Sequence, residues 1–210
     1  MQRVSTTVIA LVGASARACA EAAGAAANVR AVLPDQDAPP LDRAVEAWRE
    51  AKGAHIPYLV HDADPLATVA DAWVQRFDQP AGRGWAGEGE RGAFAGGRGW
   101  MGEGERGAFA GGRGWAGELE VAVSETVARW RARSIELPDY YLVLDAESLG
   151  ATTRHWYLGV LHRAAPVRVV PVAATPTEVI ARLSHLPAGR WWPDLDQLLS
   201  GIDRVVPDRA

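Results

Sequence analysis

Residues 7–15 of the chain read TVIALVGAS. The run from Thr7 to Val12 is apolar after its first residue, and a glycine and two small residues separate it from the alanine-rich residues 16–23. A continuous apolar run that passes through a tight glycine turn into a helix-favouring segment is typical of a strand buried on both faces of a parallel sheet. This stretch predicts the first strand and first helix of an α/β domain.

The same pattern recurs along the chain. Four further short runs rich in β-branched or aromatic residues each precede a segment whose apolar residues recur every three or four positions. Buried strands that alternate with amphipathic helices predict a three-layer, doubly wound α/β domain with a mostly parallel sheet of four or five strands. The expected strands are residues 7–12, 29–33, 56–61, 140–144 and 167–172.

Helix-start signals agree with this pattern. Asp64 before Pro65 offers a capping side chain followed by proline, the residue favoured at the first helical position. Residues 175–178, TPTE, form a capping box with the same proline device. Asp194 can begin a last short helix, which Gly201 would end.

A glycine-rich tandem repeat interrupts the pattern. Residues 82–96 read GRGWAGEGERGAFAG, and residues 97–111 repeat them with one difference, Ala86 against Met101. A third, partial copy runs into the next helix. So many glycines make ordering costly, so we interpret residues 82–117 as a mobile surface insertion. The organisation predicted is one α/β domain made of residues 1–81 and 118–210.

Composition limits the classes of function. A net charge of −4 and a pI near 5.7 leave no basic footprint for nucleic acid, so we expect no such partner. No run of 18 apolar residues exists to span a membrane, and a cytoplasmic location is expected. The alternative is export, because residues 8–12 followed by Ala14-Ser15-Ala16 imitate a short secretory signal. The oligomeric state stays open.

Candidate site residues follow the predicted strands. His61 ends one predicted strand and Asp62 and Asp64 follow it, and Asp145 and Glu147 come after another. Ligands of open parallel sheets bind beyond the carboxyl ends of the strands. If these two strands lie beside the first one, four carboxylates meet at one edge, with Asp62, Asp145 and Glu147 as candidate catalytic groups. Carboxylate oxygens there could hold Mg²⁺.

The first strand would add a phosphate-binding turn. Gly13 opens this turn, and Ser15 would either cap the helix that follows or lie beside a phosphate at its N-terminus. The turn has neither the second glycine and lysine of a phosphate-binding P-loop nor the GxGxxG of a dinucleotide site. With His61 and Asp64 as further ligand-binding candidates, the function expected is binding or turnover of a phosphorylated or nucleotide-like small molecule.

Tryptophan supports a different hypothesis. Trp48, Trp73 and Trp130 fall on apolar helix stripes and should be core residues. We expect at least one residue of each adjacent aromatic pair to lie near the surface. The pairs are Trp156-Tyr157 and Trp191-Trp192. Exposed tryptophans, above all Trp191 and Trp192, could make the chain a non-catalytic interaction module.

Overall fold

The computed structural model describes residues 6–78 and 114–207, and it contains one five-stranded sheet with the order β2-β3-β1-β4-β5. All four strand pairs are parallel, which confirms the predicted α/β class with a parallel sheet. The strands are β1 (Thr7–Val12), β2 (Val29–Val32), β3 (Tyr58–His61), β4 (Tyr140–Leu144) and β5 (Val169–Val172).

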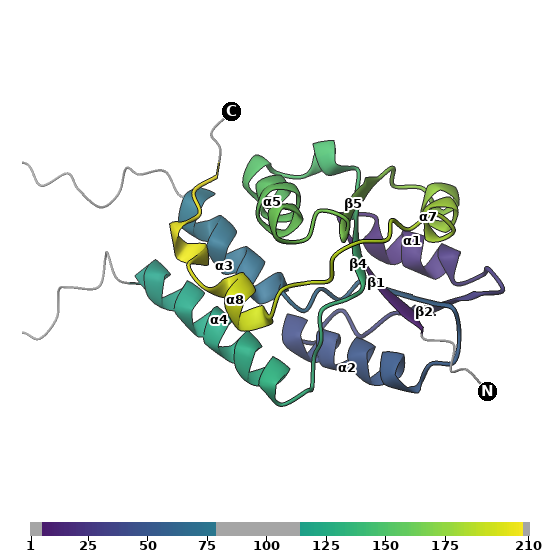
Figure 1. The fold of residues 1–210 in the computed structure, drawn as a ribbon, viewed down its shortest axis with the longest axis horizontal. Coiled ribbons are helices and arrows are strands. Elements are labelled where there is room, and N and C mark those ends of the chain that lie inside the picture. The colour runs from purple at the N-terminus through teal and green to yellow at the C-terminus, as the bar shows by residue number, and fades with distance from the viewer. Residues whose placement is uncertain (1–5, 79–113, 208–210) are drawn as a thin grey trace, which may run out of the picture.

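Helices cover both faces of this sheet (Figure 1). On one face, Ile9 and Leu11 of β1 pack with α1 and α7, which lie side by side. On the other face, Ala10 and Val12 pack in a larger apolar core with α3, α4 and α8, and Val8 packs against α2. Alternate residues of β1 point to opposite faces, so its nearly continuous burial follows from its central position.

The helices follow the strands in chain order. They are α1 (Ala16–Ala23), α2 (Pro40–Gly53), α3 (Ala67–Asp78), α4 (Gly114–Arg131), α5 (Ala151–His155), α6 (His162–Ala164), α7 (Pro176–Leu183) and α8 (Leu195–Leu199). Between α5 and α6 lies a π-helical segment, η2 (Trp156–Leu161), and two short 3₁₀ turns are η1 (Ala146–Ser148) and η3 (Ile202–Arg204).

Two of the predicted helix starts have capping hydrogen bonds in the structure, whereas α3 begins at Ala67, two residues after the predicted first position Pro65. The hydroxyl of Thr175 accepts a hydrogen bond from the Glu178 N–H at the start of α7, and Asp194 caps α8. Gly201 follows α8 with a φ of +77°. The helix expected near residue 118 begins earlier, at Gly114, inside the third partial repeat. The rest of the tandem repeat, residues 82–113, lies outside the described residues.

Two of the aromatic expectations differ from the structure. Trp73 is fully buried, but Trp48 and Trp130 are only partly buried. Trp156 and Tyr157 are both buried, so the expectation that one of them reaches the surface is wrong. Both belong to the π-helical segment η2. A π-helix turns less per residue than an α-helix, because its hydrogen bonds run from i to i+5, and two neighbours can therefore face the core together.

Candidate functional site at the carboxyl ends of the strands

The candidate site residues lie at the ends of three strands, β1, β3 and β4, which are neighbours in the sheet. β1 pairs with β3 through Ala10 and His61 and with β4 through Val12 and Val143, so the three strands end at the same edge of the sheet. The arrangement on which the predicted site depended is therefore present. What the side chains do at this edge differs from one strand to the next.

Gly13 joins β1 to α1 in a conformation that favours glycine. Its φ is +121°, and a Cβ built on it would lie 2.9 Å from the carbonyl oxygen of Leu144. A side chain here would collide with backbone at the end of β4. Gly13 thus brings the first turn against β4 and closes the seam between β1 and β4 at the sheet edge.

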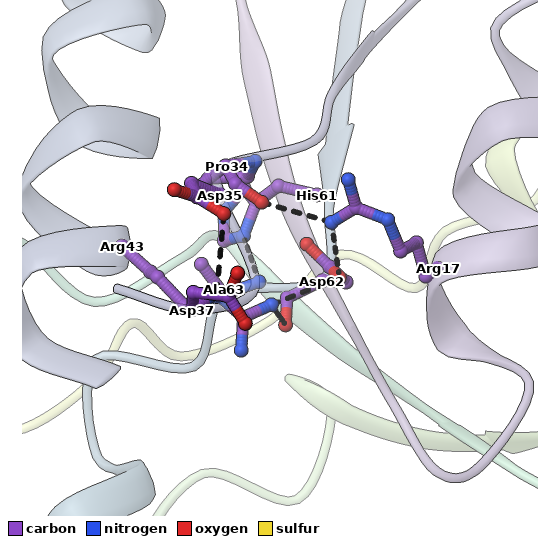
Figure 2. A network of polar contacts seen from close by, with 8 residues as sticks. All are labelled: Arg17, Pro34, Asp35, Asp37, Arg43, His61, Asp62 and Ala63. Carbon is purple, nitrogen blue, oxygen red and sulfur yellow. Dashed lines mark hydrogen bonds and ion pairs between the residues drawn. The ribbon is translucent and has the colours of Figure 1, made fainter. Parts of the chain in front are cut away.

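Asp62 lies at the centre of an ion cluster that joins helices from the two faces of the sheet (Figure 2). Its Oδ2 is 2.9 Å from a terminal nitrogen of Arg43 in α2 and 3.3 Å from one of Arg17 in α1. The same nitrogen of Arg17 donates to the carbonyl oxygen of Pro34, just beyond β2, at 2.8 Å. The side chain of Asp62 is only 5% exposed, whereas those of Arg17 and Arg43 are 34% and 21% exposed. One buried carboxylate is shared by two guanidinium groups that reach solvent.

Hydrogen-bonding capacity is left over in this cluster. A guanidinium carries five N–H donors, and the Nε of Arg43 is buried without a hydrogen-bond partner among the described residues. The same holds for Oδ1 of Asp62. Buried polar atoms without a protein partner usually have an ordered water or a ligand beside them. Exposed Asp35 and Asp37, linked by a hydrogen bond from the Asp37 N–H to Asp35, form the outer rim (Figure 2).

Neither arginine was singled out as a site residue from the sequence. Arg17 and Arg43 both lie in the first turn of their helices. A cation is disfavoured there, because the N-terminal end of a helix carries partial positive charge. That mismatch between residue type and position was the one local signal that could have drawn attention to them.

His61 is buried at the end of β3 and is not a free acid or base at the edge. Its Nδ1 accepts a hydrogen bond from the Ala63 N–H at 3.3 Å. Burial lowers the pKa of His61 to about 4, against a smaller opposing effect of the neighbouring Asp62 carboxylate. The imidazole is therefore neutral at pH 7.

Asp64 lies behind the edge, in the core. One oxygen accepts hydrogen bonds from the Leu66 N–H and the Tyr141 hydroxyl, and the other accepts one from the Tyr157 hydroxyl, each at 2.8 Å. Burial raises the pKa of Asp64, although the three hydrogen bonds work in the opposite direction. The carboxyl ties the end of β3 to β4 and to η2, so its donors are protein groups and not a ligand.

The two acids after β4 lie in a more open place. Asp145 is exposed and has a φ of 42°, and its Oδ1 accepts a hydrogen bond from the Ala174 N–H at 2.9 Å. Glu147 is turned outward, with its side chain 90% exposed, and pairs with Arg154 at 2.6 Å. A hollow of about 670 Å³ lies between the ends of β4 and β5 and includes Asp145, Glu147 and Ser148 in its lining.

The four carboxylates therefore do not converge. Asp62 is engaged by arginines, Asp64 by hydroxyl groups, Asp145 by a backbone N–H and Glu147 by a different arginine. Within residues 6–78 and 114–207, no group of three or more His, Cys, Asp or Glu side chains is placed to hold a metal ion. The Mg²⁺ hypothesis thus finds no cage of protein ligands at this edge.

Ser15 holds the N-cap position of α1, but its hydroxyl makes no capping hydrogen bond. The expectation that its side chain caps the helix is therefore wrong. The first turn of α1 also has no acidic side chain. Its N-terminal N–H groups, which normally seek an acceptor, thus receive none from the Ser15 side chain.

The tryptophan pair near the C-terminus is divided between core and surface. Trp192 is buried, donates to the Pro138 carbonyl at 2.7 Å and lies edge-on to Tyr141. Trp191 is 53% exposed, and the guanidinium carbon of Arg168 lies over the Trp191 ring, 4.5 Å from the ring centroid. A partner surface formed by both tryptophans is therefore not available, because Trp192 belongs to the core.

No family model, no curated protein and no solved structure matches this chain. No helix in the described part of the chain is long and apolar enough to cross a membrane.

Proposed function

We propose that this protein binds a phosphorylated or nucleotide-like small molecule at the carboxyl ends of β1 and β3, with Arg17 and Arg43 as the phosphate-binding side chains. The observation that carries the proposal is the sharing of one buried carboxylate, Asp62, by two partly exposed guanidinium groups. Two guanidinium groups around one buried carboxylate have N–H donors that Asp62 does not use, at the point where an open parallel sheet binds its ligands, and the carboxylates of Asp35 and Asp37 lie farther out at the rim.

The start of α1 supports an anionic ligand at the same place. Arg17 is the second residue of this helix, directly after the turn from Gly13 to Ser15. The backbone N–H groups of a helix N-terminus and its positive dipole end favour phosphate, and the Ser15 side chain does not occupy them. Arg17 and these N–H groups would therefore bind the same anion from adjacent positions.

Asp62 has the role of a positioning residue in this proposal. Because it is buried and bonded to both arginines, it restricts their side-chain freedom before any ligand arrives. Guanidinium groups that are held in place lose less entropy when they bind a phosphate. The donors that do not face Asp62 remain for the ligand.

Asp145 and Glu147 would serve the rest of the ligand. They border the hollow at the end of β4, next along the edge from the first turn. A catalytic role for either carboxylate stays a prediction, which alanine substitution with a turnover assay would test once a ligand is found.

The test is ligand-dependent stabilisation. Thermal unfolding is followed with nucleotides, dinucleotides, coenzyme A and sugar phosphates, with and without Mg²⁺, and hits are confirmed by calorimetric titration. A ligand present at about 100 times its Kd adds roughly 2.7 kcal/mol to the stability of the folded state. For a hit at this site, Arg17→Ala should weaken binding by about tenfold or more, since hydrogen bonds to charged groups contribute about 1.5–3 kcal/mol.

Two matched variants make the result specific. Arg131→Ala removes an arginine from an exposed ion pair between α4 and α8 and should bind the ligand as the parent does. Arg17→Lys keeps the charge but not the planar fork, so its affinity should be intermediate. If no compound stabilises the protein, or if Arg17→Ala binds as tightly as Arg131→Ala, the arginine cluster is a structural ion network and the proposal is wrong.

A further inference from the structure

A basic hollow lies on the helical stretch 151–164 and shares no lining residue with the arginine cluster around Asp62. Its volume is about 580 Å³, and it is lined by Ala151, Arg154, His155, Leu158, Gly159, His162 and Arg163. These positions recur every three or four residues, so they form one face of the continuous stretch α5–η2–α6. Two basic pairs, one at each end of that face, flank a floor made partly by a glycine.

Gly159 determines the shape of this floor. A Cβ at this position would lie 2.9 Å from two ring atoms of His155. The imidazole of His155 therefore lies against the bare backbone of Gly159. On another side it is stacked on the indole of Trp73, with ring centroids 6.1 Å apart and planes 10° apart. His155 is held in place between two elements and is not a freely rotating surface side chain.

The π-helical segment makes this arrangement unusual. Segments with i to i+5 hydrogen bonds are rare and are found frequently at functional sites. Here η2 runs between His155 and His162, the two histidines of the hollow, and buries Trp156, Tyr157 and Leu161 on its inner side. Tyr157 is fixed by its hydrogen bond to Asp64. The outer side of the same segment is the floor of the basic hollow.

Little negative charge balances this face. Glu147 pairs with Arg154, but it is almost fully exposed. Among the described residues, no carboxylate lies within ion-pair distance of His155, His162 or Arg163. A neutral imidazole still offers one N–H donor, and each arginine offers several. Four side chains that supply donors around one hollow form a surface suited to an oxyanion.

We propose that the hollow on α5–η2–α6 is a second binding site, which takes the phosphate group of a small ligand between His155, His162 and Arg163. The residues proposed to bind phosphate here differ from Arg17 and Arg43, and the ion pair of Arg154 with Glu147 links the two places.

The test uses inorganic phosphate as the probe, compared with chloride at matched ionic strength. The ring-proton NMR signals of the histidines are assigned with single His→Gln variants, and phosphate is titrated at constant pH. The signals of His155 and His162 should shift along one saturable curve, while those of His55 and His185, which lie elsewhere in the fold, should not. Shifts that chloride reproduces, or that all exposed histidines share, would show an ionic-strength effect only and would overturn the proposal.

Two variants test the geometry without threatening the fold. Arg163→Gln should weaken phosphate binding by about tenfold, because it removes one charged donor. Gly159→Ala should remove the saturable shift, because the new methyl group displaces the His155 ring. Alanine is also the better helix former, so the variant should fold. Gly117→Ala is its control, since a Cβ at this helical glycine meets nothing within 4 Å.

The variants distinguish a failure of the second proposed site from a failure of the strand-end site. Arg17→Ala should leave the histidine shifts unchanged. If phosphate binding disappears in Arg17→Ala but persists in Arg163→Gln and Gly159→Ala, the phosphate belongs to the strand-end site and the second site does not exist.

Discussion

Asp62 and Asp145 each follow a buried strand directly, and both strands are neighbours of β1 at the same sheet edge. Yet Asp62 is buried between two arginines, whereas Asp145 is exposed and bonded to a backbone N–H. The difference lies in what surrounds each strand end. Near β3, the first turns of α1 and α2 converge from opposite faces, whereas the end of β4 borders an open hollow. Equivalent positions along the chain can therefore acquire opposite environments.

The largest expected effect is a difference in the free energy of unfolding between a variant of Asp62 and a variant of Asp145. Asp62→Ala should lower the free energy of unfolding by about 3 kcal/mol, the lower end of the loss for a broken buried ion pair, because the two guanidinium groups lose their counter-ion but still reach solvent. Asp145→Asn should cost less than about 1 kcal/mol, since asparagine keeps the hydrogen-bond acceptor and tolerates the positive φ. Urea denaturation of the two variants measures the difference. Equal losses would mean that the two strand ends do not differ as described.

The second effect is the pH dependence of stability that His61 contributes at the end of β3. The pKa of His61 is about 4 in the folded chain and about 6.5 when unfolded, so between these values the unfolded state binds more protons. Stability should therefore fall by about 3 kcal/mol as the pH drops from 6.5 to 4.

The measurement is the difference between the parent and His61→Asn across this pH range. Raised pKa values of Asp64, Asp71 and Asp139 act in the opposite direction, and the subtraction removes them because the variant keeps all three. Parallel curves for the two proteins would show that His61 titrates normally and is not buried as described.

The smallest effect concerns the contact between the turn after β1 and the end of β4. Gly13→Ala should cost about 2 kcal/mol, because the methyl group meets the Leu144 carbonyl and the backbone must hold a strained φ. Gly201→Ala is the comparison, since its φ is also positive but its Cβ would be in open space, and it should cost about 1 kcal/mol. If Gly13→Ala lost no more stability than Gly201→Ala, the contact with the Leu144 carbonyl would add nothing to the cost.

Much of the fold could be predicted from local patterns. The runs at residues 7–12 and 140–144 coincide with β1 and β4, because a strand buried on both faces is a continuous apolar run. The remaining strands are shorter than predicted. β3 begins at Tyr58, after Pro57, whose missing N–H excludes it from a central strand ladder.

The candidate site was less predictable. The sequence indicated the acids after the strands but neither Arg17 nor Arg43, because their importance depends on helices that meet only in three dimensions. It indicated a capping role for Ser15 that its side chain does not perform. It also indicated a surface position for one residue of Trp156-Tyr157, because nothing in the local pattern predicts a π-helical segment.

The sequence by itself determined the alternation of strands and helices, the parallel class of the sheet and the positions where loops leave the strands. These depend on hydrophobic periodicity and turn chemistry, which act over a few residues. Only the tertiary structure decided the strand order, the pairing of Asp62 with two arginines and the burial of Asp64 and Trp192. Charge and burial at a site depend on residues distant in the chain, so no local pattern contains them.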